Sequence, residues 1–257
     1  MSRSIFKILI TTLSVFYLAC GDIPRDNGLD PKNPDSIASQ KVMIEAFVNT
    51  HNPASVNEYA LQALDSLSFL YGDRIVIAEY HRNTTNYTDP DHLDKCELLY
   101  QHYISQTQGI KGVPDIFING LNQRVQGASS MEYSLFRLEA ALAEEVSGNT
   151  YFQFDTRYKR TDNRIRPEIR LARLGTLDAD PLLVKALIVS RVRAPHHKRV
   201  VKSVVESRLI THLAHGEQTD VNLPEMVIDP EFLNTLVVYV TDADATTIYQ
   251  SDACEIQ

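Results

Sequence analysis

The chain has 257 residues, of which 44% are hydrophobic and 23% are charged, and its formal net charge is −8. This composition excludes a globally disordered chain, because enough apolar side chains are present to build a buried core. The acidic balance excludes nucleic acid as a general partner, because binding to phosphates needs local positive charge. The length allows one large domain or two small ones.

The N-terminus has the features of a secretory signal peptide. Arg3 and Lys7 lead into a short apolar run, too short to span a bilayer comfortably, which ends at Cys20. Leu18-Ala19-Cys20-Gly21 resembles a bacterial lipobox, in which the cysteine is diacylated and becomes the new N-terminus, although Tyr17 departs from the aliphatic residue that is usual there. The alternative is an ordinary cleaved signal followed by an incidental cysteine.

We therefore expect a signal peptide over residues 1–19 and a lipidated tether over residues 20–40. The tether holds three prolines and several Asp and Asn residues, so little of it can pack against a domain. Loss of the signal removes two basic residues and no acidic ones, so the mature chain is more acidic still.

Residues 41–147 show an alternation of strand and helix patterns. Residues 42–47 and 75–78 are short apolar runs typical of buried strands, and between them apolar residues recur at helical spacing up to Gly72. A helix is predicted over 89–106. Strands are predicted at 116–118 and 123–125, on either side of Asn119-Gly120, a pair that tolerates the positive φ of a tight turn. A last helix is predicted over 131–145.

From residue 148 onward the pattern is of strands alone. The predicted strands cover residues 151–154, 165–171, 182–192, 200–205 and 236–240. Several of them alternate apolar and polar residues, as half-buried antiparallel strands do. We expect a small all-β, sandwich-like domain over 148–257, after an α/β domain over 41–147.

The βαβ–α–ββα order, with Gly112-Val113-Pro114 before the hairpin, resembles the thioredoxin superfamily. In that fold the corresponding proline is cis and its loop faces the active site. The whole layout is also similar to a family of bacterial outer-membrane lipoprotein antigens, which have a lipobox, a thioredoxin-like domain and a β-rich C-terminal domain. The resemblance favours the outer membrane over the inner, with the chain facing the periplasm or the cell surface.

The resemblance fails at the redox motif. Many relatives carry Cys-x-x-Cys-Pro shortly after the first strand, where this chain has Asn52, Ser55 and Val56. Dithiol exchange needs one activated thiolate and a second thiol to resolve the mixed disulfide, and neither residue supplies them. We expect Ser55 to cap the following helix, with His51 and Asn52 filling the loop. The alternative is a ligand site here, beside Val113 and Pro114, that captures an extended peptide without chemistry.

The two other cysteines, Cys96 and Cys254, would lie in an oxidising compartment once Cys20 is lipidated. They could pair in a disulfide or stay as separate thiols. Cys96 is also a candidate for a lone reactive thiol, with Lys95 nearby, but its acidic neighbours Asp94 and Glu97 oppose thiolate formation.

No metal or cofactor site is expected. The histidines do not have the spacing of a zinc frame, and the sequence contains no phosphate-binding, dinucleotide or hydrolase motif. A run of basic residues in the second half is expected to be a solvated strand face, or alternatively a patch for an anionic partner. Its members are Arg157, Lys159, Arg160, Arg164, Arg166, Arg191, Arg193, Lys198, Arg199 and Lys202.

Taken together, these features predict an exported lipoprotein held to a membrane by its N-terminal lipid. Its thioredoxin-like domain is expected to be redox-inactive and to serve as a binding or structural module, with a protein, peptide or glycan as ligand. The alternative function is an atypical thiol oxidoreductase or peroxidase that uses Cys96.

Overall fold

The computed structural model describes residues 30, 33, 35–175, 180–191 and 199–257. The predicted signal peptide, Cys20 and most of the predicted tether lie outside the described residues, as do Arg193 and Lys198 of the basic run. Among the helices of the described part, none is long and apolar enough to cross a membrane.

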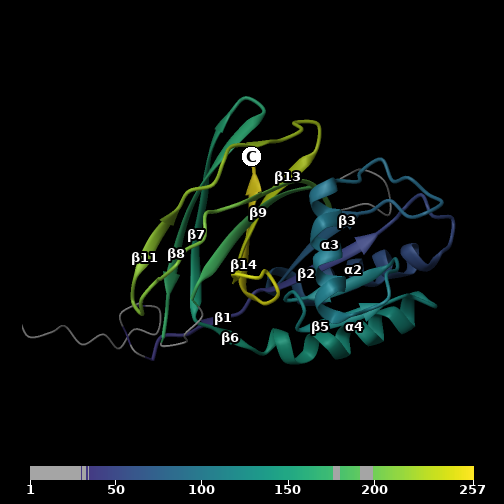
Figure 1. Cartoon of the computed structure of the whole chain (residues 1–257), viewed down its shortest axis with the longest axis horizontal. Coiled ribbons are helices and arrows are strands. Elements are labelled where there is room, and N and C mark those ends of the chain that lie inside the picture. Colours follow the sequence, from purple (N-terminus) through teal and green to yellow (C-terminus); the bar gives the residue numbers. More distant parts are fainter. Residues whose placement is uncertain (1–29, 31–32, 34, 176–179, 192–198) are drawn as a thin grey trace, which may run out of the picture.

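The N-terminal half follows the predicted order of strands and helices (Figure 1). Its elements are β2 (Val42–Val48), α2 (Val56–Tyr71), the 3₁₀ turn η1 (Gly72–Arg74), β3 (Ile75–His81), α3 (Asp94–Thr107), β4 (Asp115–Ile118), β5 (Gln123–Gln126) and α4 (Met131–Val146). Strands β2 and β3 are parallel, whereas β4 is antiparallel to both β2 and β5. The expected βαβ–α–ββα order is therefore present.

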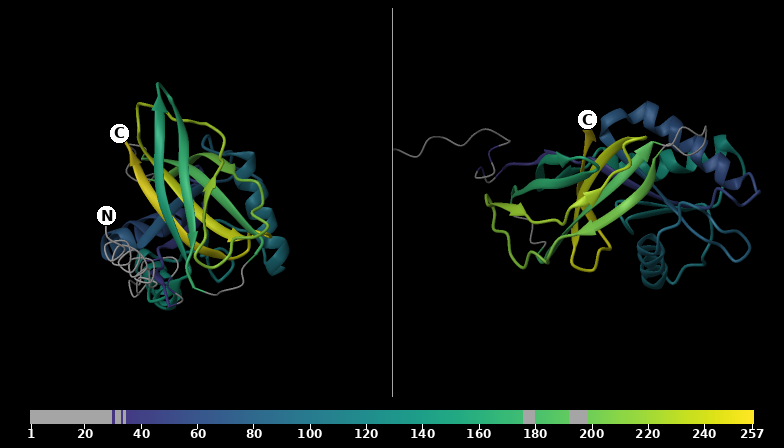
Figure 2. Two further views of the ribbon diagram at one scale, coloured as in Figure 1. Left: turned by 90° about the vertical axis from the view of Figure 1, so that its left-hand side faces the viewer. Right: turned by 90° about the horizontal axis from the view of Figure 1, so that it is seen from above.

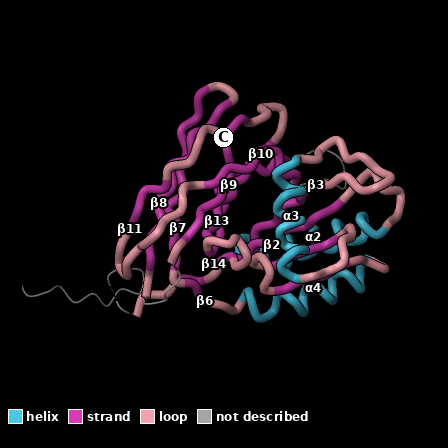
Figure 3. Tube along the Cα trace, viewed as in Figure 1, coloured by secondary structure: helices cyan, strands magenta, loops and turns pink. Residues whose placement is uncertain are grey.

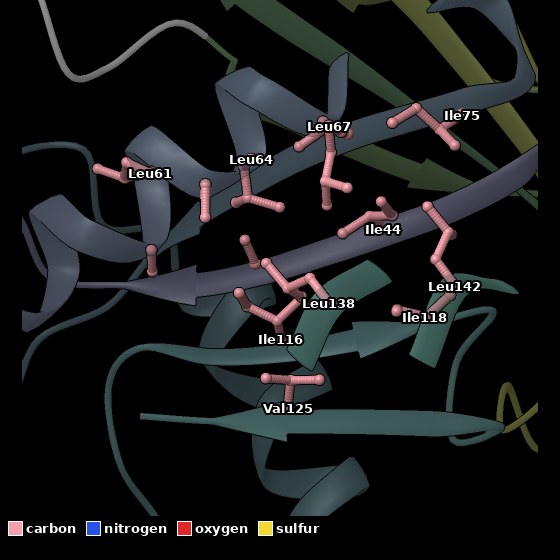
Figure 4. Packing of buried hydrophobic residues seen from close by; sticks show 14 of the residues in the cluster. Ile44, Leu61, Leu64, Leu67, Ile75, Ile116, Ile118, Val125, Leu138 and Leu142 are labelled. Carbon is pink, nitrogen blue, oxygen red and sulfur yellow. The ribbon is translucent and has the colours of Figure 1, made fainter. Parts of the chain in front are cut away.

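Helices cover both faces of these strands. Helices α2 and α4 pack on one face and α3 on the other, because each helix has apolar residues at three- and four-residue spacing. The core between α2, α4 and the sheet is shown in Figure 4. It includes Ile44 of β2, Leu64 and Leu67 of α2, and Leu138 and Leu142 of α4. Gly72 ends α2 as predicted, with a φ of 55° and its N–H donated to the carbonyl of Ser68.

Helix α3 begins later than predicted. The sequence places its start near Asp89, but the helix begins at Asp94. Asp89 is buried, and its carboxylate accepts hydrogen bonds from the backbone N–H groups of Thr50 (2.9 Å) and Asp91 (3.0 Å). These bonds hold the segment after β3 as a loop against the end of β2, so the helix cannot start until this loop has ended.

The turn after β4 has the backbone conformation that its sequence predicts. Asn119 and Gly120 have φ values of 50° and 72°. The connection is longer than a two-residue hairpin, because the register pairs Ile118 with Gln123. The Asn119 side chain accepts a hydrogen bond from the Met43 N–H at 2.9 Å, and the Asn119 N–H donates to the Met43 carbonyl at 2.8 Å. The turn is thereby fixed to β2.

The C-terminal half contains the predicted strands and several others. The predicted strands are β7 (Phe152–Thr161), β8 (Arg164–Arg173), β9 (Leu182–Arg191), β10 (Val200–Glu206) and β13 (Leu233–Asp242). The strands of this half that the sequence analysis missed are β6 (Asn149–Thr150), β11 (Gln218–Val221), β12 (Met226–Val227) and β14 (Ile248–Ile256). It also missed β1 (Ala38–Ser39), which lies within the predicted tether and pairs antiparallel with β6. These strands are short or lie at sheet edges, so their sequences carry few of the apolar residues that mark a buried strand.

The strands of the two predicted domains form one long sheet. Its eight strands have the order β14-β13-β9-β10-β3-β2-β4-β5, and the two halves join where β10 runs parallel to β3 at Val200 and Glu79. A second sheet of β7, β8, β11 and β12 packs on β9 and β13 and forms the expected sandwich. The helices lie at one end of the molecule and this second sheet at the other (Figure 2 and Figure 3). The boundary expected near residue 147 therefore separates two patterns in the sequence but does not interrupt the sheet.

The long sheet curves back on itself. Gly120, in the turn after β4, forms an antiparallel bridge with Thr247 at the start of β14, and the Leu121 N–H donates to the Thr246 carbonyl at 2.7 Å. Helix α3 covers the inner face of this curve and shares one hydrophobic core with both halves of the sheet. Core residues from the sheet include Met43, Phe47, Tyr80, Leu187, Val237 and Tyr239.

The bridge between the β4 turn and β14 leaves no room for a side chain at Gly120. A Cβ there would lie 2.3 Å from the Thr246 carbonyl oxygen, whereas Gly127, with a nearly equal φ of 73°, has no atom within 4 Å of its position. We expect Gly120→Ala to lower the free energy of unfolding by about 3 kcal/mol and Gly127→Ala by about 1 kcal/mol. Urea unfolding of both variants measures the difference, and equal losses would contradict the close contact.

Candidate functional site

The loop between β2 and α2, where a dithiol is missing, is organised by Asn49. Asn49 is fully buried, and its Oδ1 accepts hydrogen bonds from the N–H groups of His51 (3.0 Å) and Asn52 (2.9 Å). Its Nδ2 donates to the carbonyls of Arg82 (2.7 Å) and Tyr87 (2.9 Å). One buried amide thus satisfies four backbone groups and attaches the loop to the segment after β3.

The predicted site residues lie on the surface of this loop. His51 and Ser55 are exposed, and Asn52 is half-buried with its Oδ1 accepting the Ala54 N–H at 3.0 Å. Ser55 stands at the N-cap of α2, as predicted, but its hydroxyl makes no capping hydrogen bond. The prediction of a side-chain cap is wrong because Ser55 has helical dihedral angles (φ −63°, ψ −5°), whereas a capping serine is typically extended.

The Val113–Pro114 peptide bond is cis, as the resemblance implies. The segment before it is held by Tyr100 of α3. The Gly112 N–H donates to the Tyr100 hydroxyl oxygen at 2.8 Å, and this hydroxyl lies 2.8 Å from Oδ2 of Asp115, to which it donates. The Gly112 N–H, one residue before the Val113–Pro114 pair, is therefore already used within the protein.

Arg82, which the sequence analysis missed, connects the two segments. Its guanidinium donates to Glu97 through Nε (2.7 Å) and Nη2 (3.0 Å), lies 3.5 Å from the ring centroid of Tyr100, and reaches the Gly112 carbonyl at 3.4 Å. Burial by itself would raise the pKa of Glu97. The hydrogen bond from Arg82 acts in the opposite direction and more strongly, so the pKa of Glu97 is lowered. The Arg82 carbonyl accepts from Asn49. The sequence places this arginine directly after a buried strand, which is a weak signal of a buried ion pair.

A second buried ion pair, between His81 and Asp89, lies at the end of β3. Nδ1 of His81 is 3.0 Å from Oδ1 of Asp89, and both side chains are fully buried. Burial opposes the charge of Asp89, but His81 and the N–H groups of Thr50 and Asp91 outweigh it, so the pKa of Asp89 lies well below its ordinary value. The pair fixes the loop after β3 to the loop after β2.

His81, Asp89 and Asp91 offer ligand atoms that lie within 4.8 Å of one another, close enough to hold a metal ion. Both carboxylates already have protein partners, since Asp89 accepts from Thr50 and Asp91 is paired with Lys202. The histidines of this region do not converge, and each has a separate partner. The cluster is accounted for as a hydrogen-bond network that holds the loops in place.

Cys96 and Cys254 are free thiols, so the disulfide considered between them is not formed. Cys96 points into the core under α3 with 1% of its surface exposed, whereas Cys254 lies half-buried on the edge strand β14. Burial, assisted by the charge of Glu45, raises the pKa of Cys96 to about 12. A thiol with this pKa is protonated at neutral pH and is a poor nucleophile.

Glu45 is a buried carboxylate at the centre of the curved sheet. Its Oε1 accepts a hydrogen bond from the Tyr80 hydroxyl at 3.1 Å, and its Oε2 accepts one from the Tyr103 hydroxyl at 2.7 Å. Burial raises the pKa of Glu45, although the Tyr103 hydrogen bond and the charge of Lys185 oppose the increase. The sequence analysis missed this residue because it stands inside an apolar run.

The basic residues of β7 and β8 are paired with acids rather than gathered into a positive patch. The pairs are Arg157–Asp155, Lys159–Glu168, Arg166–Glu225 and Arg170–Asp220. All of these side chains are exposed, so each pair contributes only about 0–1 kcal/mol to stability. The expectation of a solvated strand face agrees with this arrangement.

Comparison with solved structures supports a thioredoxin-like fold and a β-rich architecture. HBP35 of Porphyromonas gingivalis matches with a TM-score of 0.62 over 85% of this chain and 76% of that chain, at 14% identity. A structural-genomics protein of Agrobacterium tumefaciens matches with a TM-score of 0.51 over 84% of this chain and 94% of that chain, at 17% identity. At these identities the likeness is one of fold. No family model matches the sequence, and no curated protein matches it.

The buried pair of His81 and Asp89 predicts a pH-dependent loss of stability on mutation. We expect Asp89→Asn to lower the free energy of unfolding at pH 7 by about 3 kcal/mol, because an amide cannot accept all the hydrogen bonds that the buried carboxylate makes with the Thr50 and Asp91 N–H groups and the His81 ring. The pKa of Asp89 is lowered from 3.8, so its contribution is complete above that pH and is lost as the pH falls below it. Guanidinium unfolding at several pH values measures this change.

Asp91→Asn is the matched control, because Asp91 has 24% of its side chain exposed and pairs at the surface with Lys202. We expect it to cost about 1 kcal/mol or less. A loss for Asp89→Asn that equals the control, or that does not shrink in acid, would show that the His81–Asp89 pair does not stabilise the loops.

Proposed function

We propose that this chain is a cell-envelope lipoprotein, anchored through Cys20, whose thioredoxin-like part binds a ligand and does not exchange disulfides. The N-terminal sequence supports the anchor, with its basic start, short apolar run and lipobox-like end. The outer membrane is the proposed location. The thioredoxin-like fold places the protein in a group of structures whose loops commonly bind other molecules, but fold alone does not assign the ligand.

The observation that carries the proposal is the chemistry of the loop before α2. The Asn52 amide oxygen accepts the Ala54 N–H and closes the loop, and the Ser55 side chain is exposed. A thiol–disulfide exchange needs two sulfur atoms here, one to attack and one to release the mixed disulfide. Neither is present, so we infer that the loop has a fixed, structural conformation.

The alternative function, thiol chemistry at Cys96, is disfavoured by burial and by the raised pKa of this residue. Capture of an extended peptide beside Pro114 stays an alternative, because the contact with Tyr100 uses the N–H of Gly112 and not that of Val113, the residue before the cis bond. A pocket elsewhere in the protein is a further candidate.

An insulin-reduction assay tests the redox part of the proposal. We expect the wild-type full chain, with dithiothreitol as reductant, to leave the rate of insulin precipitation at its uncatalysed value. The double variant Asn52→Cys, Ser55→Cys restores the two thiols at the start of α2 and is expected to raise that rate. Catalysis by the wild-type chain would overturn the proposal.

Mass spectrometry of the alkylated, unreduced protein from native membranes tests the anchor in the same preparation. We expect a diacylated Cys20 at the N-terminus, alkylation of the half-buried Cys254 and no alkylation of Cys96 until the chain is unfolded. An unmodified Cys20 would contradict the anchor, and rapid alkylation of folded Cys96 would favour the thiol-based alternative.

A further inference from the structure

A pocket of about 430 Å³ lies between α3 and the C-terminal part of the long sheet, away from the loop before α2. Figure 1 shows α3 beside β9 and β13, the elements that form its two sides. Its volume falls in the range of small-molecule sites, about 300–1,000 Å³. The apolar walls are Leu98 and Leu99 of α3, Leu183 of β9, Val204 and Val205 of β10, and Ala245. Leu98 is 65% exposed, which leaves one wall open to solvent.

Lys185 of β9 lines this pocket and is only 8% exposed. Within the part of the chain that the structure describes, its ammonium group has no hydrogen bond or ion pair. Lys185 is therefore a positive charge at the wall of the pocket without a direct contact to an acid. An anion in the pocket would supply that contact.

The hydroxyl of Tyr239 is a second polar group at this pocket. It is buried and interacts with Glu45 and Tyr80, lowering the pKa of the first and raising that of the second. The Tyr239 hydroxyl therefore belongs to the polar cluster around Glu45, and Lys185 is the donor that the pocket offers to an acceptor group.

Two acids lie near Lys185: Glu206 is its partner in the β9–β10 register, and Glu45 interacts with it through the core. The two oxygens of Glu45 already accept hydrogen bonds from Tyr80 and Tyr103. Burial raises the pKa of Glu45, which favours its neutral form.

The rim of the pocket sets a limit on the charge of a ligand. Glu206 and Asp244 are exposed at the mouth, and they would repel a group with several negative charges. Lys95, whose Nζ donates to the Val204 carbonyl at 3.0 Å, offsets them in part. A single negative charge placed deep in the pocket avoids this repulsion and reaches Lys185.

We propose that this pocket binds a small monocarboxylic acid with an aliphatic body, its carboxylate on Lys185 and its chain between α3 and β10. The inference deepens the proposed binding function and rests on it. The insulin and mass-spectrometry results do not depend on this pocket, so failure here would leave the redox-inactive, anchored assignment standing.

Isothermal titration of the full chain in lipid nanodiscs with octanoate tests the proposal. Empty nanodiscs are titrated as well, because octanoate also enters the lipid. We expect saturable binding at neutral pH, at least about tenfold tighter than binding of octan-1-ol, which has the same chain and no charge. No saturable binding up to about 10 mM, or equal binding of the alcohol, would overturn the proposal.

The variant Lys185→Met keeps the apolar stem and removes the ammonium group. We expect it to weaken octanoate binding at least about tenfold and to leave octan-1-ol binding unchanged. Lys95→Met is the matched control, since Lys95 lies at the rim and already donates to Val204, and it is expected to change binding less than about threefold. Equal effects of the two substitutions would overturn the role of Lys185.

A second variant keeps the test valid if Lys185→Met disturbs the fold. Leu98→Glu adds a negative charge on the exposed wall of the pocket and is expected to weaken octanoate binding by repulsion. Phe136→Glu is the control, because it adds the same charge on α4, at a residue that is 67% exposed. Unchanged binding by Leu98→Glu, in a variant with the wild-type melting temperature, would overturn the proposed path of the ligand.

Discussion

The fold depends on the short contact at which β10 joins β3. The two strands pair in parallel at Val200 and Glu79, and the Glu79 N–H donates to the Arg199 carbonyl at 2.8 Å. The Arg199 guanidinium adds an ion pair with Asp65 of α2 at 2.9 Å and lies 3.7 Å from Glu79. This contact makes one sheet out of strands from two halves of the chain. Because the sheet also curves until Gly120 meets Thr247, α3 packs on residues from both halves.

This arrangement gives the two halves a common interior, and the buried charges lie along it. Glu45 is held by tyrosines from β3 and α3, while Lys185 comes from β9 in the other half. Polar groups of this kind are expensive to bury, and the tyrosine hydroxyls offset part of that cost for Glu45. The pocket beside Lys185 exists because the second half of the chain supplies one of its walls. A thioredoxin-like unit without β9, β10 and β13 would lack it.

The loop before α2 is held by a network of buried polar groups. Asn49, Arg82 and Asp89 direct their hydrogen bonds to backbone groups and to buried partners around this loop. Buried polar networks of this kind make a loop rigid when every member is satisfied. The cis peptide bond at Pro114 keeps the backbone of the fold, but the groups near it contact each other rather than leave an open site.

Much of the fold could be predicted from local patterns, whereas the candidate site could not. The strand of residues 42–48, the helix ending at Gly72 and the Asn119-Gly120 turn have signals within a few residues, and each is present. The delayed start of α3 depends on contacts of Asp89 with Thr50, a residue far away in the sequence. The edge strand β14 has too few apolar residues to predict. Glu45 and Lys185 each lie in an apolar strand, and their roles follow only from strands that meet in space.

Hydrogen–deuterium exchange of the full chain, with and without octanoate, tests most directly whether binding takes place at the shared interior. The account predicts slower exchange in peptides that cover residues 95–102 of α3 and the strands around Lys185 and Tyr239. It predicts no change in the loop before α2 or in the segment of Gly112 to Pro114. Protection confined to that loop and that segment would contradict the account, because it would place the binding function beside the cis peptide bond and not in the pocket at Lys185.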